Sequence, residues 1–230
     1  YSRRDVVEFI QEGLVCVDGK KILQINYLVK GNQKVTVKGK AIDYSHSFFY
    51  YKFYKPKGVI TTMDDPKNRK TIKPYLDKVS SYIVPVGRLD RATSGLLLVT
   101  NDGDWSHKIM HPLFECPKLY RVGLDKPITH YDVRRIQAGV FLDDGPVVVQ
   151  GVELESKTQF LIKVSEGRNR IIRRLFSFLG YDVVLLKRLE IGPISLGTLK
   201  EGQLKLAGII ENLAKNQNSG NASILANMEG

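Results

Sequence analysis

The stretch from Gly87 to Trp105, GRLDRATSGLLLVTNDGDW, constrains the fold of this chain more than any other. Its middle, Leu96 to Val99, is a short apolar run, which predicts a buried strand. The sequence Asn101-Asp102-Gly103 that follows predicts a turn. We therefore expect the rest of the chain to be organised around this strand and the loop that precedes it.

That loop places Asp90 between Arg88 and Arg91. A carboxylate between two arginines is expected to stay ionised, because nearby opposite charge favours the charged form. A charged group on a loop beside a rigid strand is well placed to act as a catalytic residue. A solvated surface salt bridge in a turn is the simpler interpretation of the same three residues.

The string GRLD followed by TSGLLLVTNDG resembles the signature of the ribosomal RNA pseudouridine synthases, in the branch typified by RsuA and RluB. In that family the aspartate of RLD is the catalytic residue, which implies this role for Asp90. The resemblance covers about residues 1–207. It implies an α+β pseudouridine synthase fold, with a mixed, mainly antiparallel sheet and flanking helices around a central cleft. The catalytic domain would span residues 48–215.

Three further motifs resemble the same family and imply the remaining site residues, namely KPKGVITT, KLYRV and EGRNRIIRR. KPKGVITT would support the cleft. Tyr120 of KLYRV would stack on the target base. An arginine of the third motif pairs with the catalytic aspartate in related synthases; by position this is Arg173, with Arg174 as the alternative. Arg88 would fill the space that a flipped uridine leaves in its helix.

The third motif places four arginines near the start of an expected helix. Cations at a helix N-terminus oppose the macrodipole, so a ligand or a carboxylate is expected as their partner. We predict RNA contacts from the arginines of this motif other than the one that pairs with Asp90: Arg168, Arg170 and Arg174.

Residues 1–44 predict a small basic α/β module. A helix is expected from a capping box at Ser2 to Gly13, and Asp18-Gly19 predicts a tight hairpin turn. The segment resembles the RNA-binding module shared with a small-subunit ribosomal protein but lacks its usual first helix, so we expect a fragment with an incomplete module. Its predicted RNA contacts are Arg3, Arg4, Lys20 and Lys21.

The remaining pattern predicts alternating strands and helices. Strands are expected at 48–54, 118–122, 159–164 and 181–191, and helices at 104–110, 129–138 and 209–214. The Asn-, Ser-, Gly- and Ala-rich residues 216–230 predict a disordered tail. Asp143-Asp144-Gly145 is expected to be a turn, although its two acids also suggest acid–base chemistry.

The net charge and the two cysteines restrict which partners and which cellular compartment are expected. The chain of 230 residues carries 35 Lys and Arg against 24 Asp and Glu, a net charge of +11, which favours a polyanionic partner. No apolar run is long enough to span a bilayer, and no signal peptide is recognisable. Cys16 and Cys116 lie far apart, so free thiols in a reducing cytosol are expected.

We therefore expect an isomerase that converts a uridine of ribosomal RNA to pseudouridine by base flipping. The partner would be ribosomal RNA or a pre-ribosomal particle, with no membrane and no cofactor, because neither redox chemistry nor group transfer occurs. The Arg-Asn-Arg and GPISLG details resemble the large-subunit group more than the small-subunit group. Whether Asp90 attacks the sugar, attacks the ring or removes a proton stays open.

Two other classes of protein fit parts of the pattern. A catalytically silent RNA-binding or ribosome-assembly factor would need only the basic residues, and the intact Asp90 motif argues against it. A glycoside hydrolase needs a second carboxylate in a comparable context, and none is evident. His107 and His111 have the spacing of metal ligands, but no further ligand completes a site, so no metal is expected.

Overall fold

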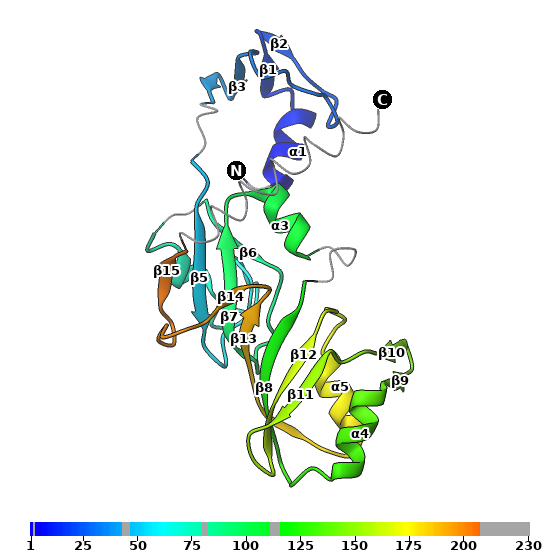
Figure 1. Cartoon of the computed structure of the whole chain (residues 1–230). Helices are drawn as coiled ribbons and strands as arrows, with labels where there is room; N and C mark the ends of the chain where they lie inside the picture. Colours follow the sequence, from blue (N-terminus) through cyan, green and yellow to red (C-terminus); the bar gives the residue numbers. More distant parts are fainter. Residues whose placement is uncertain (2, 43–46, 80–81, 111–115, 208–230) are drawn as a thin grey trace, which may run out of the picture. The chain divides into compact units, whose positions relative to one another are not determined.

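The computed structural model describes residues 1, 3–42, 47–79, 82–110 and 116–207. The chain divides into two compact units, Tyr1–Ser47 and Phe48–Gly230, which are described separately (Figure 1). The predicted helix at 209–214 and the predicted disordered tail lie outside the described residues.

The first unit is one helix and a four-stranded sheet with the strand order β2-β1-β3-β4. Asp18 and Gly19 have φ values of 50° and 79°, as the predicted hairpin turn requires. Ile10 packs on the valines of β1 and β3. The predicted capping residue Ser2 is outside the described residues. The elements are α1 (Arg3–Gln11), β1 (Val15–Val17), β2 (Lys20–Lys21), β3 (Val35–Val37) and β4 (Lys40–Ala41).

The second unit is built on a nine-stranded sheet with the order β11-β12-β8-β13-β7-β5-β15, in which β14 also pairs with β13 and β6 with β7. Its pairs are antiparallel except for β13 with β7. The strands are β5 (Tyr50–Lys55), β6 (Val84–Val86), β7 (Ser94–Thr100), β8 (Lys118–Leu124), β11 (Gly151–Leu154), β12 (Gln159–Val164), β13 (Val183–Ile191), β14 (Ile194–Ser195) and β15 (Leu204–Leu206).

The central strand β7 explains the apolar run that dominates the sequence. Leu96 and Leu98 pack with Trp105 in one core cluster, whereas Leu97 and Val99 pack with Phe53 in another. Because successive side chains of a strand point to opposite faces, β7 is buried on both sides of the sheet. The strand predicted from Leu96 to Val99 is therefore present and central.

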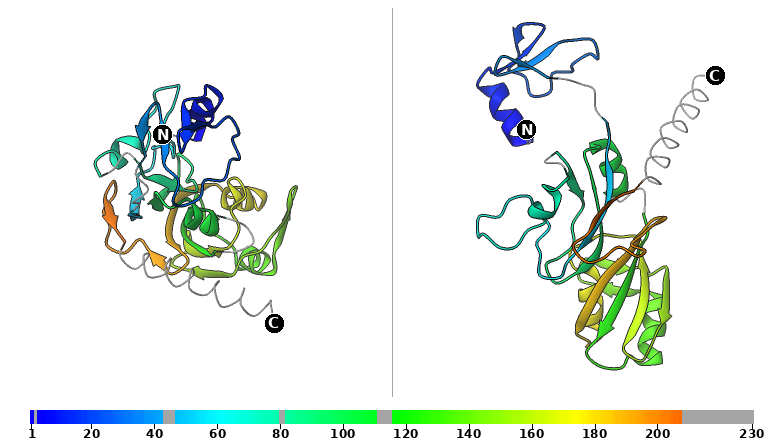
Figure 2. Two further views of the ribbon diagram at one scale, coloured as in Figure 1. Left: turned by 90° about the horizontal axis from the view of Figure 1, so that it is seen from above. Right: turned by 90° about the vertical axis from the view of Figure 1, so that its left-hand side faces the viewer.

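The helices of the second unit cover the sheet. Figure 1 shows α4 and α5 side by side, and their side chains share a core cluster with β8, β12 and β13. Figure 2 shows these three strands next to one another. The hydroxyl oxygen of Thr129 accepts a hydrogen bond from the Asp132 amide and caps α4, as predicted. The helices are α2 (Lys73–Leu76), α3 (Gly103–Met110), α4 (His130–Ala138) and α5 (Ile171–Phe178).

A small hairpin of β9 (Val140–Leu142) and β10 (Gly145–Val147) follows α4 and turns at Asp143-Asp144. The predicted fold class, α+β with a mixed, mainly antiparallel sheet, is confirmed. Cys16 and Cys116 are free thiols. Among the described residues, no helix has both the length and the apolar character that crossing a membrane requires.

Candidate active site

Asp90 lies on the loop between β6 and β7, and a second loop holds it in place. The amide of Gly58 donates to the carbonyl of Arg91 at 2.7 Å, and Arg91 Nε donates back to the Gly58 carbonyl at 3.2 Å. The hydroxyl of Thr61 donates to the Leu89 carbonyl at 2.8 Å. Gly58 has φ +87°, a backbone conformation that favours glycine. The KPKGVITT segment thus clamps the Asp90 loop on both sides of the aspartate.

The Asp90 carboxylate is half-buried and makes no hydrogen bond or ion pair with any described residue. It nevertheless lies within electrostatic reach of two cations, because its charge raises the pKa of both Lys55 and Arg173 against the effect of burial. An ionised carboxylate with free lone pairs is available for chemistry on a bound substrate.

Four residues on adjacent strands form one row across the sheet beside this loop. Lys55 of β5 pairs with Gly95 of β7, Gly95 with Arg188 of β13, and Arg188 with Tyr120 of β8. Directly paired residues point to the same face, so Lys55, Arg188 and Tyr120 share a face. Gly95 is required here, because a Cβ atom would lie 2.2 Å from the Arg188 carbonyl oxygen.

Lys55 is fully buried, and its Nζ donates to the carbonyls of Pro56 at 2.8 Å and Val59 at 2.7 Å. Burial lowers the pKa of Lys55 to about 8, and the nearby Arg188 charge acts in the same direction. The negative charges of Asp90 and Glu201 oppose this shift. Lys55, the first residue of the KPKGVITT segment, is therefore a buried cation whose charge interacts with that of Asp90.

Arg173 of α5 reaches the same loop but does not form the predicted pair with Asp90 among the described contacts. Its Nη1 donates to the Val183 carbonyl at 2.7 Å and its Nη2 to the Ala92 carbonyl at 3.1 Å. Burial first, and then the charge of Arg170, lower the pKa of this guanidinium. Arg173 therefore fixes the backbone two residues after Asp90.

Two arginines that are predicted to contact RNA, Arg168 and Arg174, form ion pairs with Asp144. Arg174 donates two hydrogen bonds to the Asp144 carboxylate, at 2.7 and 2.6 Å. Arg168 donates to the same carboxylate at 2.9 Å and to the Pro146 carbonyl at 2.6 Å. They tie the β9–β10 turn to the start of α5, so Asp144 is a turn residue with two arginine partners. Arg170 is exposed, with φ +50°, immediately before α5.

The other predicted RNA-binding residues lie on exposed surfaces. Arg88 is exposed on the Asp90 loop, whereas Tyr120, the residue predicted to stack on the target base, is half-buried on β8. In the first unit, Arg3 and Arg4 are exposed on α1, and Lys20 and Lys21 are exposed on β2.

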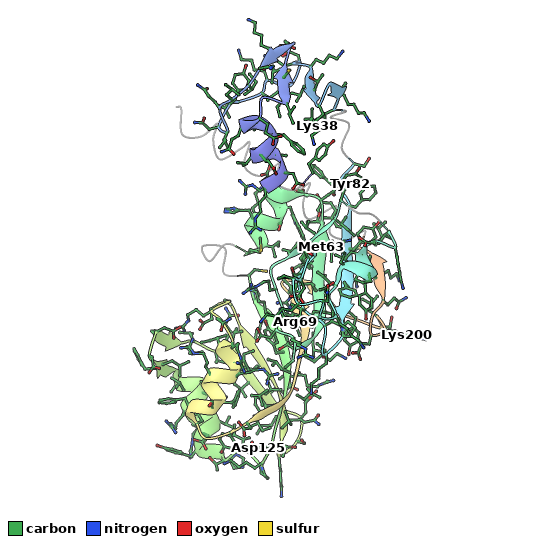
Figure 3. The ribbon with its side chains drawn as sticks, turned by 180° about the vertical axis from the view of Figure 1, so that it is seen from behind. Lys38, Met63, Arg69, Tyr82, Asp125 and Lys200 are labelled. Carbon is green, nitrogen blue, oxygen red and sulfur yellow. The ribbon has the colours of Figure 1, made fainter. Side chains whose placement is uncertain are left out.

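Figure 3 labels Lys200 near the β15 edge of the second unit and Asp125 at the end of β8. A hollow of about 250 Å³ lies against β5 and β15, lined in part by Lys52, Lys200 and Lys205. It contains none of the predicted site residues. Within the described ranges, no three His, Cys, Asp or Glu side chains are grouped to hold a metal ion, and His111 lies outside them.

Sequence reasoning missed two members of this site, Lys55 and Arg188. Both lie in strands rich in apolar or aromatic residues, YYKFYK and VVLLKRLEI. A cation inside such a strand is the signal that could have identified them, because charged side chains are rarely fully buried without a specific role.

Comparison with known proteins agrees with this geometry. Residues 50–178 match the RNA pseudouridylate synthase family, and residues 1–35 match the S4 domain. The chain is 37% identical over 211 residues to the ribosomal large subunit pseudouridine synthase B of Bacillus subtilis, covering 89% of this chain and 86% of that protein. An uncharacterized RNA pseudouridine synthase of Mycobacterium tuberculosis is 35% identical over 212 residues, covering 89% and 84%.

A solved structure described as a pseudouridylate synthase superposes with a TM-score of 0.68 and 27% identity, covering 91% of this chain and 92% of that one. This chain belongs to the RNA pseudouridylate synthase family. It is therefore an isomerase that converts uridine to pseudouridine in RNA, and the predicted family and pseudouridine synthase fold are confirmed.

Proposed function

We propose that this protein converts a uridine of ribosomal RNA, in the large subunit, to pseudouridine, and that Asp90 performs the chemistry. The observation that carries the assignment of Asp90 is a carboxylate clamped in position without a partner among the described residues. The similarity to the Bacillus subtilis large-subunit enzyme supports the choice of RNA. The site of action would be the cytoplasm, where ribosomal RNA is found.

The reaction breaks the bond between uracil N1 and ribose C1′, turns the base, and forms a bond from C5 to C1′. The proton on C5 then leaves, and N1 gains one, so atoms and electrons balance without a cofactor. The target atoms are not accessible inside a helix, so the uridine must be flipped out. Asp90 can act as the nucleophile or as a base, and either role needs an ionised carboxylate with free lone pairs.

The other residues support this step. Tyr120 lies in the same region of the sheet and would stack on the flipped base through its half-exposed ring. Arg173 would keep the Asp90 loop in register through the Ala92 carbonyl. Arg88, exposed on the loop, would occupy the space that the uridine vacates.

We also propose a division of labour between domains, with residues 1–44 as an RNA-binding module and 48–215 as the catalytic domain. The match of residues 1–35 to the S4 domain and the exposed cations of α1 and β2 support this division. Ribosomal RNA, free or in a pre-ribosomal particle, would be the partner.

The test is to incubate the full chain separately with large-subunit and small-subunit ribosomal RNA and to map pseudouridine at single-nucleotide resolution. We expect one uridine of the large-subunit RNA to be converted without added cofactor. Conversion only in the small-subunit RNA would correct the substrate. Tight RNA binding with no conversion in either RNA, free or in particles, would identify a catalytically silent binding protein and overturn the proposal.

A further inference from the structure

Arg188 is a buried cation, and none of the steps of the reaction outlined above uses it. The residue is 4% exposed, and it forms no ion pair with any described carboxylate. Burying a charged group costs free energy unless it is paired and hydrogen-bonded. A hydrophobic residue would fit a central strand such as β13 at lower cost, so the charge itself calls for an explanation.

Arg188 contacts both β7, the strand that follows the Asp90 loop, and Tyr120 of β8. Its Nε donates to the carbonyl of Leu96 on β7 at 2.8 Å. Its Nη1 lies 3.5 Å from the Tyr120 hydroxyl oxygen, at the outer limit for a hydrogen bond. Its Nη2 is buried and has no hydrogen-bond partner among the described residues. The guanidinium is thus held by its Nε, while its Nη1 makes only a long contact and its Nη2 remains available as a donor.

The sheet fixes this arrangement. Arg188 pairs directly with Tyr120 on β8 and with Gly95 on β7, and the register of β13 and β8 shifts immediately after it, between Arg188 and Glu190. Bulges of this kind often lie beside active sites, where they direct a side chain. The missing side chain at Gly95 lets the backbones of β7 and β13 approach closely.

We propose that Arg188 is a positioning residue for the isomerisation: from inside the sheet it holds the hydroxyl of Tyr120 and so sets the angle at which the tyrosine ring meets the flipped base. This inference rests on the proposed function. Because Arg188 is buried, it acts through Tyr120 and does not touch the RNA. Hydrogen bonds of catalytic groups are often long without substrate and tighten when it binds. The Nη1 contact with Tyr120 can shorten while Nε keeps its bond to the Leu96 carbonyl, because Nη2 has no partner that would have to be given up.

The simpler alternative is that Arg188 only joins β7 to β13 through the Leu96 carbonyl. In that case its removal would lower stability and leave the chemical step unchanged. A positioning role therefore predicts a change in the rate of the chemical step, whereas a purely structural role predicts a change in stability alone.

The experiment compares Arg188→Met and Arg188→Lys with the native full chain. The readouts are the single-turnover rate at saturating RNA, the Kd for RNA and the Tm. We expect Arg188→Met to slow the chemical step by about 100-fold, as a misplacement of a positioned group by about 1 Å can do, with Kd within about twofold. Arg188→Lys keeps the charge and should recover part of this rate.

Lys187 offers a matched control on the same strand. Its Nζ lies 4.6 Å from the centroid of the Tyr54 ring, and its neighbouring position in the strand turns it to the opposite face. Lys187→Met removes one cation from β13 and should leave the single-turnover rate unchanged.

A double-mutant cycle keeps the inference testable if Arg188→Met does not fold. When Tyr120 is already phenylalanine, Arg188→Lys should have little further effect on the rate, because the hydroxyl it serves is gone. Fully additive effects, or a native rate in Arg188→Met, would overturn the inference. An inactive native chain would instead overturn the proposed function, so the two failures are distinguishable.

Discussion

Asp90 and Asp144 both lie near arginines in the second unit, but their carboxylates differ in hydrogen bonding. Asp144 accepts hydrogen bonds from Arg174 and Arg168, and the Arg174 bonds are the main cause that lowers its pKa to about 2. Asp90 has no such partner among the described residues, although its charge acts on Lys55 and Arg173.

The difference shows how one fold separates a structural carboxylate from a reactive one. At Asp144 the neighbouring arginines donate to the carboxylate itself and to the turn around it. At Asp90 the surrounding cations donate to backbone carbonyls instead, as Lys55 does to Pro56 and Arg173 does to Ala92. Their charge reaches the Asp90 carboxylate while its lone pairs stay available.

Among substitutions of residues other than the two carboxylates, the largest effect on this comparison is expected from Arg173→Ala set against Arg174→Ala. Displacement of the Ala92 backbone should misplace Asp90, and such a shift can lower the single-turnover rate by about 100-fold. Arg174→Ala breaks the Asp144 pair and should leave the rate within a few-fold of native. An inactive Arg174→Ala beside a normal Arg173→Ala would exchange the two roles, and equal losses would remove the distinction between them.

The pH dependence of stability in Lys55→Met, compared with the native chain, tests whether burial lowers the pKa of Lys55 near Asp90. The pKa of Lys55 is lowered to about 8 by burial, so the folded state holds its proton less firmly than the unfolded state. This penalty is fully present below about pH 8 and disappears as the pH rises toward the ordinary lysine value near 10.4. Relative to Lys55→Met, the native chain should therefore become more stable between pH 7 and pH 10.

The measurement for Lys55 is urea unfolding of both chains across that range, with the Lys52→Met chain as a control from the same strand. A stability difference that is constant with pH would show that Lys55 keeps an ordinary pKa. Such a result would mean that burial does not disfavour the charged form of Lys55.

A smaller effect is expected from Lys20→Gln combined with Lys21→Gln, two exposed lysines of β2 that lie outside both carboxylate regions. If they neutralise RNA phosphates, the slope of log affinity against log salt should flatten by somewhat under about one unit for each phosphate that is no longer neutralised. The single-turnover rate at saturating RNA should not change. An unchanged salt slope would indicate that this strand does not bind RNA.

Much of this molecule could be predicted from local sequence. The β7 strand, the Asp18-Gly19 turn and the Thr129 cap follow from side-chain pattern and turn chemistry, which act over a few residues. Arg188 and Lys55 could not be placed in this way, because strands β5, β7, β13 and β8 come together only in the folded sheet. The partner of Arg174 was missed for the same reason, since Asp144 lies 30 residues away.

The smallest predicted effect is that of Asp144→Asn. Asp144 is exposed, so its charge is screened by solvent, and the remaining amide can still accept a hydrogen bond from Arg174. We expect a slight fall in Tm and no change in the single-turnover rate. A marked loss of catalysis would mean that the β9–β10 turn takes part in the reaction.

The account is tested most directly by measuring the single-turnover rate and the RNA Kd of Asp90→Asn beside those of Asp144→Asn. Both substitutions keep side-chain size and remove one negative charge. The account predicts that Asp90→Asn loses on the order of 10³-fold or more in rate with nearly native Kd and Tm, while Asp144→Asn keeps the native rate. Appreciable pseudouridine formation by Asp90→Asn, or a comparable loss in Asp144→Asn, would contradict it.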